Sequence, residues 1–304
     1  MKISYLVTCH NESESLDKSL HVILSYKDKE DEVLVLDDFS DNQKTQEILK
    51  KWEAPDCKII QHALDRNYGA HKNHGNEKCT GDWIFQIDGD EIPNPNLIVN
   101  IKAIIEANPD AELIFVPRIN DFIGVTEEHA KQWGWRLTPC DACEGRLIVQ
   151  WPDYQGRIYK RDTARIRWDR RLHEKIEGHT NFVTLPPDTD LALYHDKTIE
   201  TQMNTNIRYN QWFTEEENRG HNVFEQGIRS IPPTRPGEKR FVANILSTSE
   251  SIIRFSVWKA RGKRPEIGEK MPMADPEKNR NFDILVTQFV EEKEEEWIFE
   301  GKEI

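Results

Sequence analysis

The sequence NYGAHKNHGNEKCTGDWIFQIDGDEIP, residues 67–93, decides the fold of this chain. It runs from a glycine-bearing loop through a short helical segment into an apolar strand at residues 83–87, which ends at Asp88-Gly89-Asp90-Glu91. In open α/β sheets, ligands bind at the carboxyl ends of the strands. Two carboxylates separated by one glycine can turn toward one hard cation and its oxygen-rich ligand. Taken alone, the same residues are also typical of an acidic turn that ends a strand.

Strands and helices alternate through the first hundred residues. Apolar segments predict strands at residues 2–8, 32–36, 57–61 and 83–87, and the continuous run at 32–36 is typical of buried, parallel strands. Between them, cap residues at 11–13 and 37–41 and apolar positions at helical spacing predict helices at residues 13–24, 43–52 and 70–79. Because consecutive β-then-α units imply right-handed crossovers, we expect an α/β fold with a mostly parallel sheet flanked by helices.

The later part of the chain has a less regular pattern. We expect a helix at 97–107, strands at 112–117, 146–151 and 155–160, and a short strand at 191–194 that closes on His195. Residues 120–145 indicate an irregular, substrate-facing loop, in which Trp133 and Trp135 either stack on sugar faces or fill the core. A polar, helical pattern begins near residue 199. We therefore predict an α/β domain at 1–198 and a helical extension with an acidic tail at 199–304.

Composition limits the classes of partner and compartment. Of the 304 residues 31% are charged and 37% hydrophobic, and the net charge of −13 argues against extended nucleic-acid or anionic-membrane binding. Residues 157–175 are locally basic, which fits either a solvated basic face or an anionic ligand. No apolar stretch approaches the roughly 20 residues of a membrane helix, and five scattered cysteines suit a reducing cytoplasm. Cys140 and Cys143 indicate thiols in a loop, with a redox or metal role left open.

Several motifs occur together in a familiar order. They are VTCHNES at 7–13, LDDFSDN at 36–42, the loop at 67–73, GDWIFQIDGDE at 81–91 and LHEKIEGH at 172–179. In order and spacing they resemble the family 2 glycosyltransferases with the GT-A fold, over roughly the first 200 residues. The arrangement of WPDYQGRIYKR followed by RRLHEKIEG looks more like the branch that includes lipopolysaccharide-core glucosyltransferases.

The resemblance implies roles at the nucleotide end of a donor site. Thr8 and His10 would border the base, although relatives often carry an aromatic residue at the second position. Glu12 would lie near the ribose, and Asp38 would accept a hydrogen bond from the base, most simply from the imide N–H of uracil. Lys72 would reach the diphosphate as a point charge.

The same resemblance implies a metal site and a base. Asp88, with Gly89 beside it, would meet the ribose or a metal-bound water, and Asp90 would hold a divalent cation. His195 resembles the histidine that completes the coordination, although it also fits a hydrogen-bonded histidine at a strand end. Oxygen ligands select Mg or Mn, and an imidazole favours Mn. Glu174 is the candidate base, with Glu91 and Asp141 as alternatives, and it also fits a salt bridge within its arginine-rich segment.

The predicted function is a metal-dependent, inverting transfer of a sugar from a nucleotide diphosphate, with a UDP-sugar favoured, to an acceptor hydroxyl. The acceptor is a glycan or another hydroxyl compound, including an anionic one. A sugar-nucleotide-forming nucleotidyltransferase is the alternative enzyme, but residues 8–12 lack its glycine-rich, arginine-containing loop. A non-catalytic nucleotide-sugar or carbohydrate-binding module would predict loss of the acidic residues, which are all present.

Overall fold

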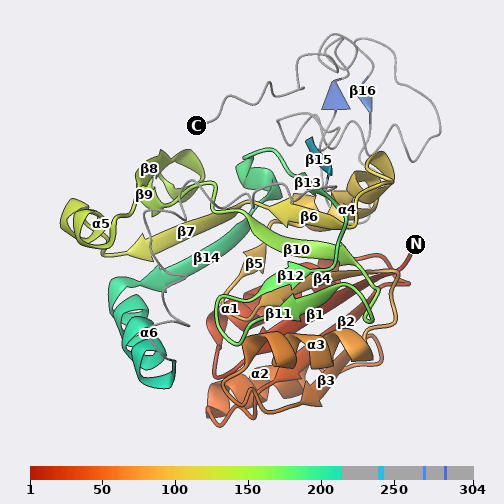
Figure 1. Cartoon of the computed structure of the whole chain (residues 1–304), viewed down its shortest axis with the longest axis horizontal. Helices are drawn as coiled ribbons and strands as arrows, with labels where there is room; N and C mark the ends of the chain where they lie inside the picture. Colours follow the sequence, from red (N-terminus) through yellow and green to blue (C-terminus); the bar gives the residue numbers. More distant parts are fainter. Residues whose placement is uncertain (214–238, 243–269, 272–283, 286–304) are drawn as a thin grey trace.

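Figure 1 shows the computed structural model, which describes residues 1–213, 239–242, 270–271 and 284–285. The first part of the chain alternates strand and helix. Its elements are β1 (Ile3–Cys9), α1 (Glu14–Tyr26), β2 (Glu32–Asp37), α2 (Gln43–Trp52), β3 (Cys57–Gln61), α3 (Tyr68–Lys78), β4 (Trp83–Asp88), β5 (Ile92–Pro93) and α4 (Pro95–Ala107). Every strand and helix expected here is present, which confirms the predicted α/β alternation.

Asparagine side chains begin three of these helices. The side chains of Asn42, Asn67 and Asn94 accept hydrogen bonds from backbone N–H groups in the first turns of α2, α3 and α4. These bonds satisfy donors that have no partner within a helix. Ser13 occupies the cap position of α1, as predicted, but makes no side-chain cap hydrogen bond.

The main sheet has the strand order β15-β13-β6-β10-β4-β1-β2-β3. Four of its strands come from later in the chain, namely β6 (Leu113–Val116), β10 (Gln155–Lys160), β13 (Asn181–Thr184) and β15 (Lys239–Val242). All neighbouring pairs are parallel except those of β10, which runs antiparallel to both β4 and β6. The predicted mostly parallel sheet is therefore confirmed, with one reversed strand in its middle.

A second sheet replaces the irregular loop that was expected at residues 120–145. Its strand order is β5-β14-β7-β9-β8, with β7 (Arg118–Ile123), β8 (Leu137–Cys140), β9 (Arg146–Val149) and β14 (Leu193–Thr198). The same segment holds the helix α5 (Glu127–Trp133) and a short 3-10 turn at Asp141–Cys143. The loop prediction was wrong because β7 is buried along most of its length and pairs with β14, some 75 residues away, so it shows no local alternation. Cys140 and Cys143 are buried, free cysteines of this second sheet.

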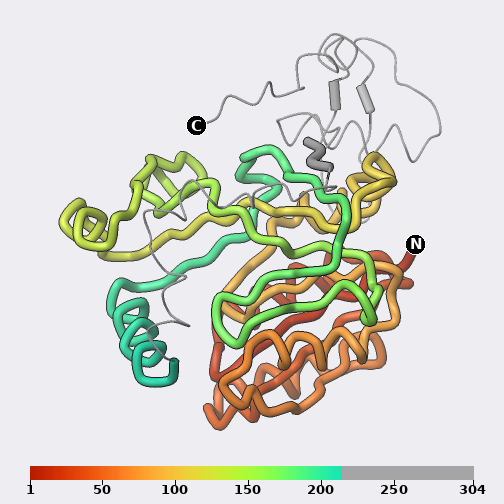
Figure 2. Tube along the Cα trace, viewed as in Figure 1, coloured from red at the N-terminus to blue at the C-terminus, as the bar shows by residue number. Residues whose placement is uncertain are grey.

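The position of His195 also differs from the prediction. The expected strand at 191–194 would have ended just before it, whereas β14 runs on to Thr198 and places His195 inside the strand. A 3-10 turn at Thr189–Leu191 precedes β14, and the helix α6 (Ile199–Trp212) follows it directly. Figure 2 shows this segment passing from the second sheet into α6 without an intervening loop.

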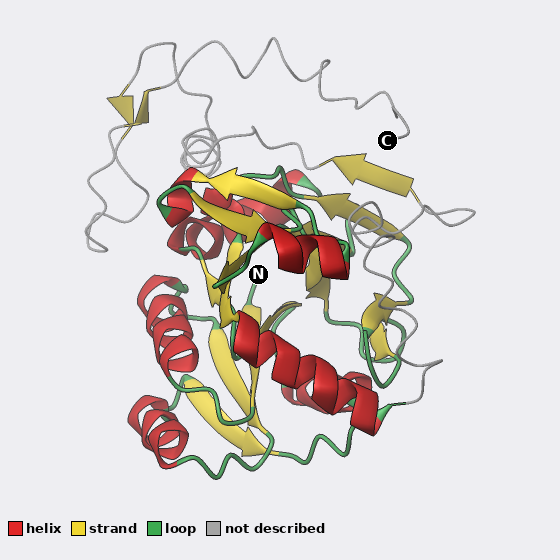
Figure 3. Cartoon of the chain, turned by 90° about the vertical axis from the view of Figure 1, so that its left-hand side faces the viewer, coloured by secondary structure: helices red, strands yellow, loops and turns green. Residues whose placement is uncertain are grey.

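Helices and a small hairpin cover the two faces of the main sheet. Successive side chains of a strand point to opposite faces, so Tyr5 and Val7 of β1 pack in a core with α1, α2 and α4. Leu6 packs on the other face, where the absence of a side chain at Gly75 lets α3 approach the strands closely. The hairpin of β11 (Arg167–Asp169) and β12 (Lys175–Glu177) adds to this second core. Figure 3 shows helices on both sides of the strands.

The region after residue 198 is described only in part. It contains α6, β15 and the pair β16 (Lys270–Met271) and β17 (Ile284–Leu285), and β15 joins the main sheet beside β13. Most of the amphipathic segment at 240–260 and the Glu-rich terminal helix expected from the sequence lie outside the described residues. The division of the chain at residue 198 stays a prediction. Among the helices that are described, none has the length and apolar character to cross a membrane.

Candidate functional site

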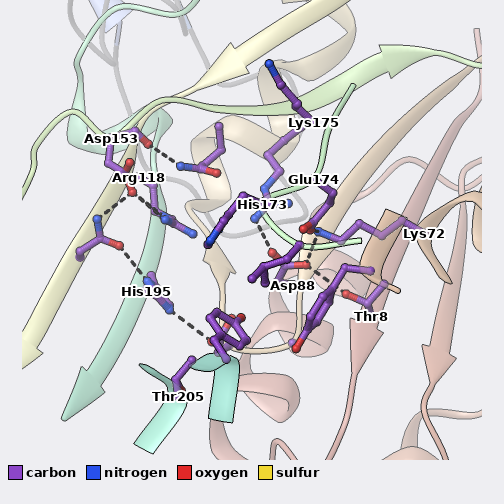
Figure 4. A pocket seen from close by; sticks show the side chains of 18 of the residues that line it. Thr8, Lys72, Asp88, Arg118, Asp153, His173, Glu174, Lys175, His195 and Thr205 are labelled. Atoms are coloured by element: carbon purple, nitrogen blue, oxygen red, sulfur yellow. Dashed lines mark hydrogen bonds and ion pairs between the residues drawn. The ribbon is translucent and has the colours of Figure 1, made fainter. Parts of the chain in front are cut away.

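A cavity of about 1730 Å³ lies at the carboxyl ends of β1 and β4, and β7 and α6 line it as well. Small-molecule pockets typically occupy about 300–1,000 Å³, so this cavity has room for two substrates. Ten lining residues were predicted as site residues from the sequence, namely Thr8, His10, Glu12, Asp38, Lys72, Asp88, Gly89, Asp90, Glu174 and His195. Figure 4 shows Thr8, Lys72, Asp88 and Glu174 on one side and Arg118, Asp153 and His195 on the other.

Asp88 is held by four side chains at the end of β4. Its Oδ1 accepts from Thr8 Oγ1 at 3.1 Å and from Gln86 Nε2 at 2.8 Å, and it lies 2.9 Å from Lys72 Nζ. Its Oδ2 accepts from Arg157 Nη2 at 2.5 Å. Burial alone would raise the pKa of Asp88, but Arg157 and Lys72 outweigh it and hold the pKa well below its usual value. Asp88 is therefore a fixed, ionised acceptor at neutral pH.

Lys72 joins Asp88 to the candidate base. Its ammonium lies 2.7 Å from Glu174 Oε1 and 4.6 Å from the ring centroid of Trp168, and its side chain is only 4% exposed. Burial lowers the pKa of Lys72, but the two carboxylates raise it above the usual value, so the amine is charged. The predicted contact between Lys72 and a diphosphate stays a prediction. The observed contacts tie Glu174 to the strand end that carries Asp88.

Glu91, one of the two alternative bases from the sequence, is fully buried behind the cavity. Its Oε1 lies 2.5 Å from Arg157 Nη2 and 2.9 Å from Arg118 Nη1, and its Oε2 accepts from the backbone N–H of Asp88 at 3.1 Å. Arg118 in turn donates to Asp153 Oδ2 through Nε at 2.9 Å and Nη2 at 2.6 Å. Glu91 thus bridges the arginine that holds Asp88 and the arginine that holds Asp153. It has no exposed surface from which to accept a substrate proton.

The candidate nucleotide end of the cavity lies at the ends of β1 and β2. His10 Nδ1 lies 2.8 Å from the backbone oxygen of Asp38 and 3.5 Å from its Oδ2. The other carboxylate oxygen of Asp38 accepts from the backbone N–H of Leu64 at 2.8 Å. The His10 side chain is 48% exposed, so one ring face is accessible to a ligand.

Glu12 lies between this end and the Asp88–Glu91 turn. It accepts from the backbone N–H of His10, and one of its oxygens would come within 3.2 Å of a Cβ added to Gly89. The same Cβ would lie 2.8 Å from the backbone oxygen of Thr8, so only glycine fits at position 89. Burial and, second, the nearby Asp90 raise the pKa of Glu12 to about 7.

Hydrogen bonds determine which nitrogen of the His195 ring carries the proton. The Nδ2 of Asn120 donates to Val149 O at 3.1 Å and to Asp153 Oδ2 at 2.8 Å, so its Oδ1 faces His195 Nδ1 at 2.8 Å as an acceptor. His195 Nδ1 therefore carries the proton. Burial lowers the pKa of His195, although Asp90 opposes it, so the ring is neutral at pH 7. Its Nε2 then presents a lone pair to Asp90 Oδ2, 3.2 Å away.

Two lone pairs that face each other at this distance favour a cation between them. In the structure, the ammonium of Lys197 lies 2.8 Å from the same Oδ2 of Asp90. Burial alone would raise the pKa of Asp90, but the nearby ammonium of Lys197 holds it well below its usual value. Imidazole and carboxylate are ligands that suit Mn²⁺, and divalent ions at phosphate sites commonly use one or two protein ligands plus substrate oxygens.

Asp90 and His195 therefore fit a divalent cation that is shared with a phosphate ligand. They do not fit a cage built from protein alone, because no group of three or more His, Cys, Asp or Glu side chains is placed to hold a metal among the described residues.

Aromatic residues line the part of the cavity beside His195. Phe122 packs edge-on against the His195 ring at 5.7 Å between centroids and against Trp135 at 5.4 Å. Trp133 and Trp135 are 4.5 Å apart, belong to an apolar cluster with Phe122 and also line the cavity. Both sequence interpretations of these tryptophans, core packing and a face toward the ligand, are compatible with this position. Across the cavity, α6 contributes a polar wall.

Sequence reasoning missed four charged residues of the site: Arg118, Arg157, Asp153 and Lys197. Arg157 was counted only as part of a basic segment, and the other three were not considered. A weak signal existed for Lys197, because it stands two positions after His195 in a strand and must share its face. Asp141, the other alternative base, lies in the 3-10 turn outside the cavity lining.

Comparison with known proteins gives partial matches to glycosyltransferases. An uncharacterized glycosyltransferase of Methanocaldococcus jannaschii is 28% identical over 116 residues, 37% of this chain and 40% of that protein. The poly-beta-1,6-N-acetyl-D-glucosamine synthase of Staphylococcus epidermidis is 26% identical over 90 residues, 30% of this chain and 22% of that protein. The chain thus spans less than half the length of either relative. Residues 1–349 of TarS from S. aureus align with 18% identity and a TM-score of 0.45, over 76% of this chain and 73% of that chain.

The match to a protein-family model is more extensive. The model described as glycosyl transferase family 2 matches residues 4–177. This range runs from β1 to β12 and contains nine of the ten predicted site residues, all except His195. The narrower resemblance to lipopolysaccharide-core enzymes stays a prediction. Since the matched range is more than half of the 304 residues, the chain belongs to glycosyl transferase family 2.

Proposed function

We propose that the chain is a metal-dependent, inverting glycosyltransferase that moves a sugar from a nucleotide diphosphate, favouring a UDP-sugar, to an acceptor hydroxyl. The observation that carries the proposal is the pair of facing acceptors, Asp90 Oδ2 and His195 Nε2, next to the fixed carboxylate of Asp88. Together they offer a cation position and a ribose acceptor at the carboxyl edge of the sheet. Family membership supports the same reaction class.

In this proposal the donor extends across the strand ends. Its base lies near His10 and Asp38, where the exposed imidazole can stack on it, and its ribose hydroxyls donate to Asp88. The diphosphate lies toward Asp90 and His195. A divalent cation bound there would stabilise the negative charge that develops on the departing diphosphate. The large remaining volume of the cavity, beside the aromatic residues, receives the acceptor.

An inverting transfer needs one base opposite the leaving group. Glu174 remains our proposed base because it lines the cavity and Lys72 holds it through Oε1. Within the described part of the chain no hydrogen bond reaches its Oε2, so this oxygen can accept from the acceptor hydroxyl. A specific observation makes Asp153 the second candidate base. The hydrogen bonds that it accepts from described side chains, those of Arg118 and Asn120, all fall on Oδ2, which leaves Oδ1 for the hydroxyl on the side away from Lys72.

The base would accept the hydroxyl proton as the acceptor oxygen bonds to the anomeric carbon and the bond to the diphosphate breaks. The electron pair of that broken bond leaves with the diphosphate. Because the base acts on the acceptor hydroxyl and not on the nucleotide, its substitution is expected to lower turnover more than donor binding.

A thermal-shift panel tests the proposal. UDP, GDP, CMP and dTDP, each as a sugar nucleotide, are added with and without Mn²⁺. Stabilisation grows as RT ln(1 + [L]/Kd), so we expect the largest shift with a UDP-sugar plus Mn²⁺. The matched control is Asp90→Asn, which should lose the Mn²⁺-dependent part of the shift. The proposal fails if no nucleotide shifts the melting temperature, and its metal part fails if Mn²⁺ has no effect in the unsubstituted protein.

A further inference from the structure

Lys197 occupies the place beside Asp90 where the proposed function puts a divalent cation. It lies on β14 two residues after His195, so the two side chains share one face of the strand. The antiparallel pairing of β14 with β5 places that face beside the Asp88–Glu91 turn. As a result, Lys197 Nζ and His195 Nε2 approach the same oxygen of Asp90, at 2.8 and 3.2 Å.

We propose that Lys197 is a built-in counter-cation which competes with the divalent metal at Asp90 and so makes metal binding depend on the donor. This inference rests on the proposed function, because it assumes the cation site at Asp90 and His195. It adds that tight metal binding depends on the donor, and it makes Lys197 responsible for this dependence.

The charges around Asp90 give the physical reason. With Lys197 in place, the single negative charge of Asp90 already faces one ammonium at 2.8 Å. A divalent cation that enters alone must displace the ammonium or lie beside it, and like charges repel strongly at such distances. A diphosphate brings its own negative charge, which compensates the metal and gives the ammonium a second partner.

The side chain of Lys197 is able to change partners. It is 17% exposed and lines the same cavity as the proposed diphosphate position, so its ammonium stays within the site after it leaves Asp90. Among the described residues, no third protein ligand lies near Asp90, so substrate oxygens must complete the coordination of a metal. This also makes metal binding depend on the donor. The geometry therefore links metal and donor through one ammonium.

Mn²⁺ titrations, with the free ion measured by electron paramagnetic resonance, test this role. Four proteins are compared, each with and without saturating UDP: the unsubstituted chain, Lys197→Met, Lys197→Arg and Lys102→Met. Lys102 is the matched control, because its side chain is 18% exposed and forms ion pairs at 2.8–3.0 Å with three carboxylates outside the cavity lining.

In the unsubstituted chain, we expect weak Mn²⁺ binding that UDP strengthens. In Lys197→Met, Mn²⁺ alone should bind about tenfold more tightly, because the ammonium no longer competes for Asp90. The strengthening by UDP should then be smaller, and by linkage Mn²⁺ should strengthen UDP binding by the same smaller factor. Lys197→Arg retains the positive charge and Lys102→Met leaves the site intact, so both should bind Mn²⁺ as weakly as the unsubstituted chain.

Three results would overturn the inference. Unchanged Mn²⁺ affinity in Lys197→Met would show that the ammonium does not compete. Equal tightening in Lys197→Arg or in Lys102→Met would show that its charge and position are not the cause. A complete lack of Mn²⁺ binding by the unsubstituted chain, with or without UDP, would remove the proposed cation site itself, whereas the first two results leave that site standing.

Discussion

Replacing Glu91 with glutamine tests whether the buried charges around the cavity act as one unit. The Glu91 side chain has no exposed surface, and its two oxygens accept from Arg118, Arg157 and the backbone N–H of Asp88. Glutamine has nearly the same shape but only one acceptor oxygen. Its NH₂ group would therefore face a donor whichever way the amide is turned. The buried Arg157 and the partly buried Arg118 would lose a shared negative charge.

The expected cost is large. Removing one partner of a buried ion pair costs about 3–5 kcal/mol, and we expect about 3 kcal/mol here because Arg118 and Arg157 keep Asp153 and Asp88 as partners. The free energy of unfolding, measured by urea titration with tryptophan fluorescence, should fall by this amount. Such a loss is a large fraction of the about 5–15 kcal/mol that stabilises a typical domain.

Glu14→Gln is the control for this measurement. Glu14 Oε1 lies 3.2 Å from Lys44 Nζ, and the two side chains are 75% and 58% exposed. A pair in contact with water contributes about 0–1 kcal/mol, so the control should lose about 1 kcal/mol. Equal losses in the two variants, or a loss below about 1 kcal/mol in Glu91→Gln, would refute the reasoning that burial makes Glu91 the shared counter-charge.

Three further predictions concern catalysis, the glycine turn and acid stability. Glu174→Gln should lower kcat by at least about a hundredfold, the usual worth of a general base, with donor affinity nearly unchanged; a larger loss in Asp153→Asn than in Glu174→Gln would transfer the role to Asp153. Gly89→Ala should weaken donor binding in calorimetry and lower the melting temperature, since its Cβ would lie 2.8 Å from a backbone oxygen, whereas Gly156→Ala, with nothing nearer than 3.4 Å, should change the melting temperature little. Burial would raise the pKa of Glu32, but the hydrogen bonds it accepts lower it to about 2. Its contribution of at most about 3 kcal/mol is thus present above pH 4.5 and lost as pH falls through about 2, so acid unfolding of Glu32→Gln should show a weaker pH dependence over that range.

The sequence predicts the donor half of this fold well because its information is local. The strands β1, β2 and β4 are mostly apolar and buried, and each intervening helix has its own cap residue and helical spacing of apolar positions. Parallel order follows from the β-then-α alternation, so Thr8, Asp38 and Asp88 can be placed at one sheet edge without knowledge of any distant contact. The convergence of these residues on one cavity agrees with that expectation.

The second sheet and the ion network could not be predicted in the same way. β7 pairs with β14 across about 75 residues, and no pattern within β7 indicates that partner. Likewise, Arg157 reaches Glu91 across 66 positions and Arg118 reaches Asp153 across 35. An arginine in a strand is usually taken as a solvated residue, and only tertiary packing shows that these two are cations of the site.

The reversed strand β10 affects which segments at the ligand-binding edge of the sheet can vary in sequence. In a fully parallel sheet, only loops that follow strands reach the edge where ligands bind. Because β10 runs against β4, the segment that precedes it, with Asp153, and the first residues of β10, with Arg157, also reach this edge. Insertions or exchanges between β7 and β10 could therefore remodel the proposed acceptor side while β1 to β4, at the proposed nucleotide site, keep their register. Under the proposed function, acceptor choice and donor recognition could then change independently on one continuous sheet.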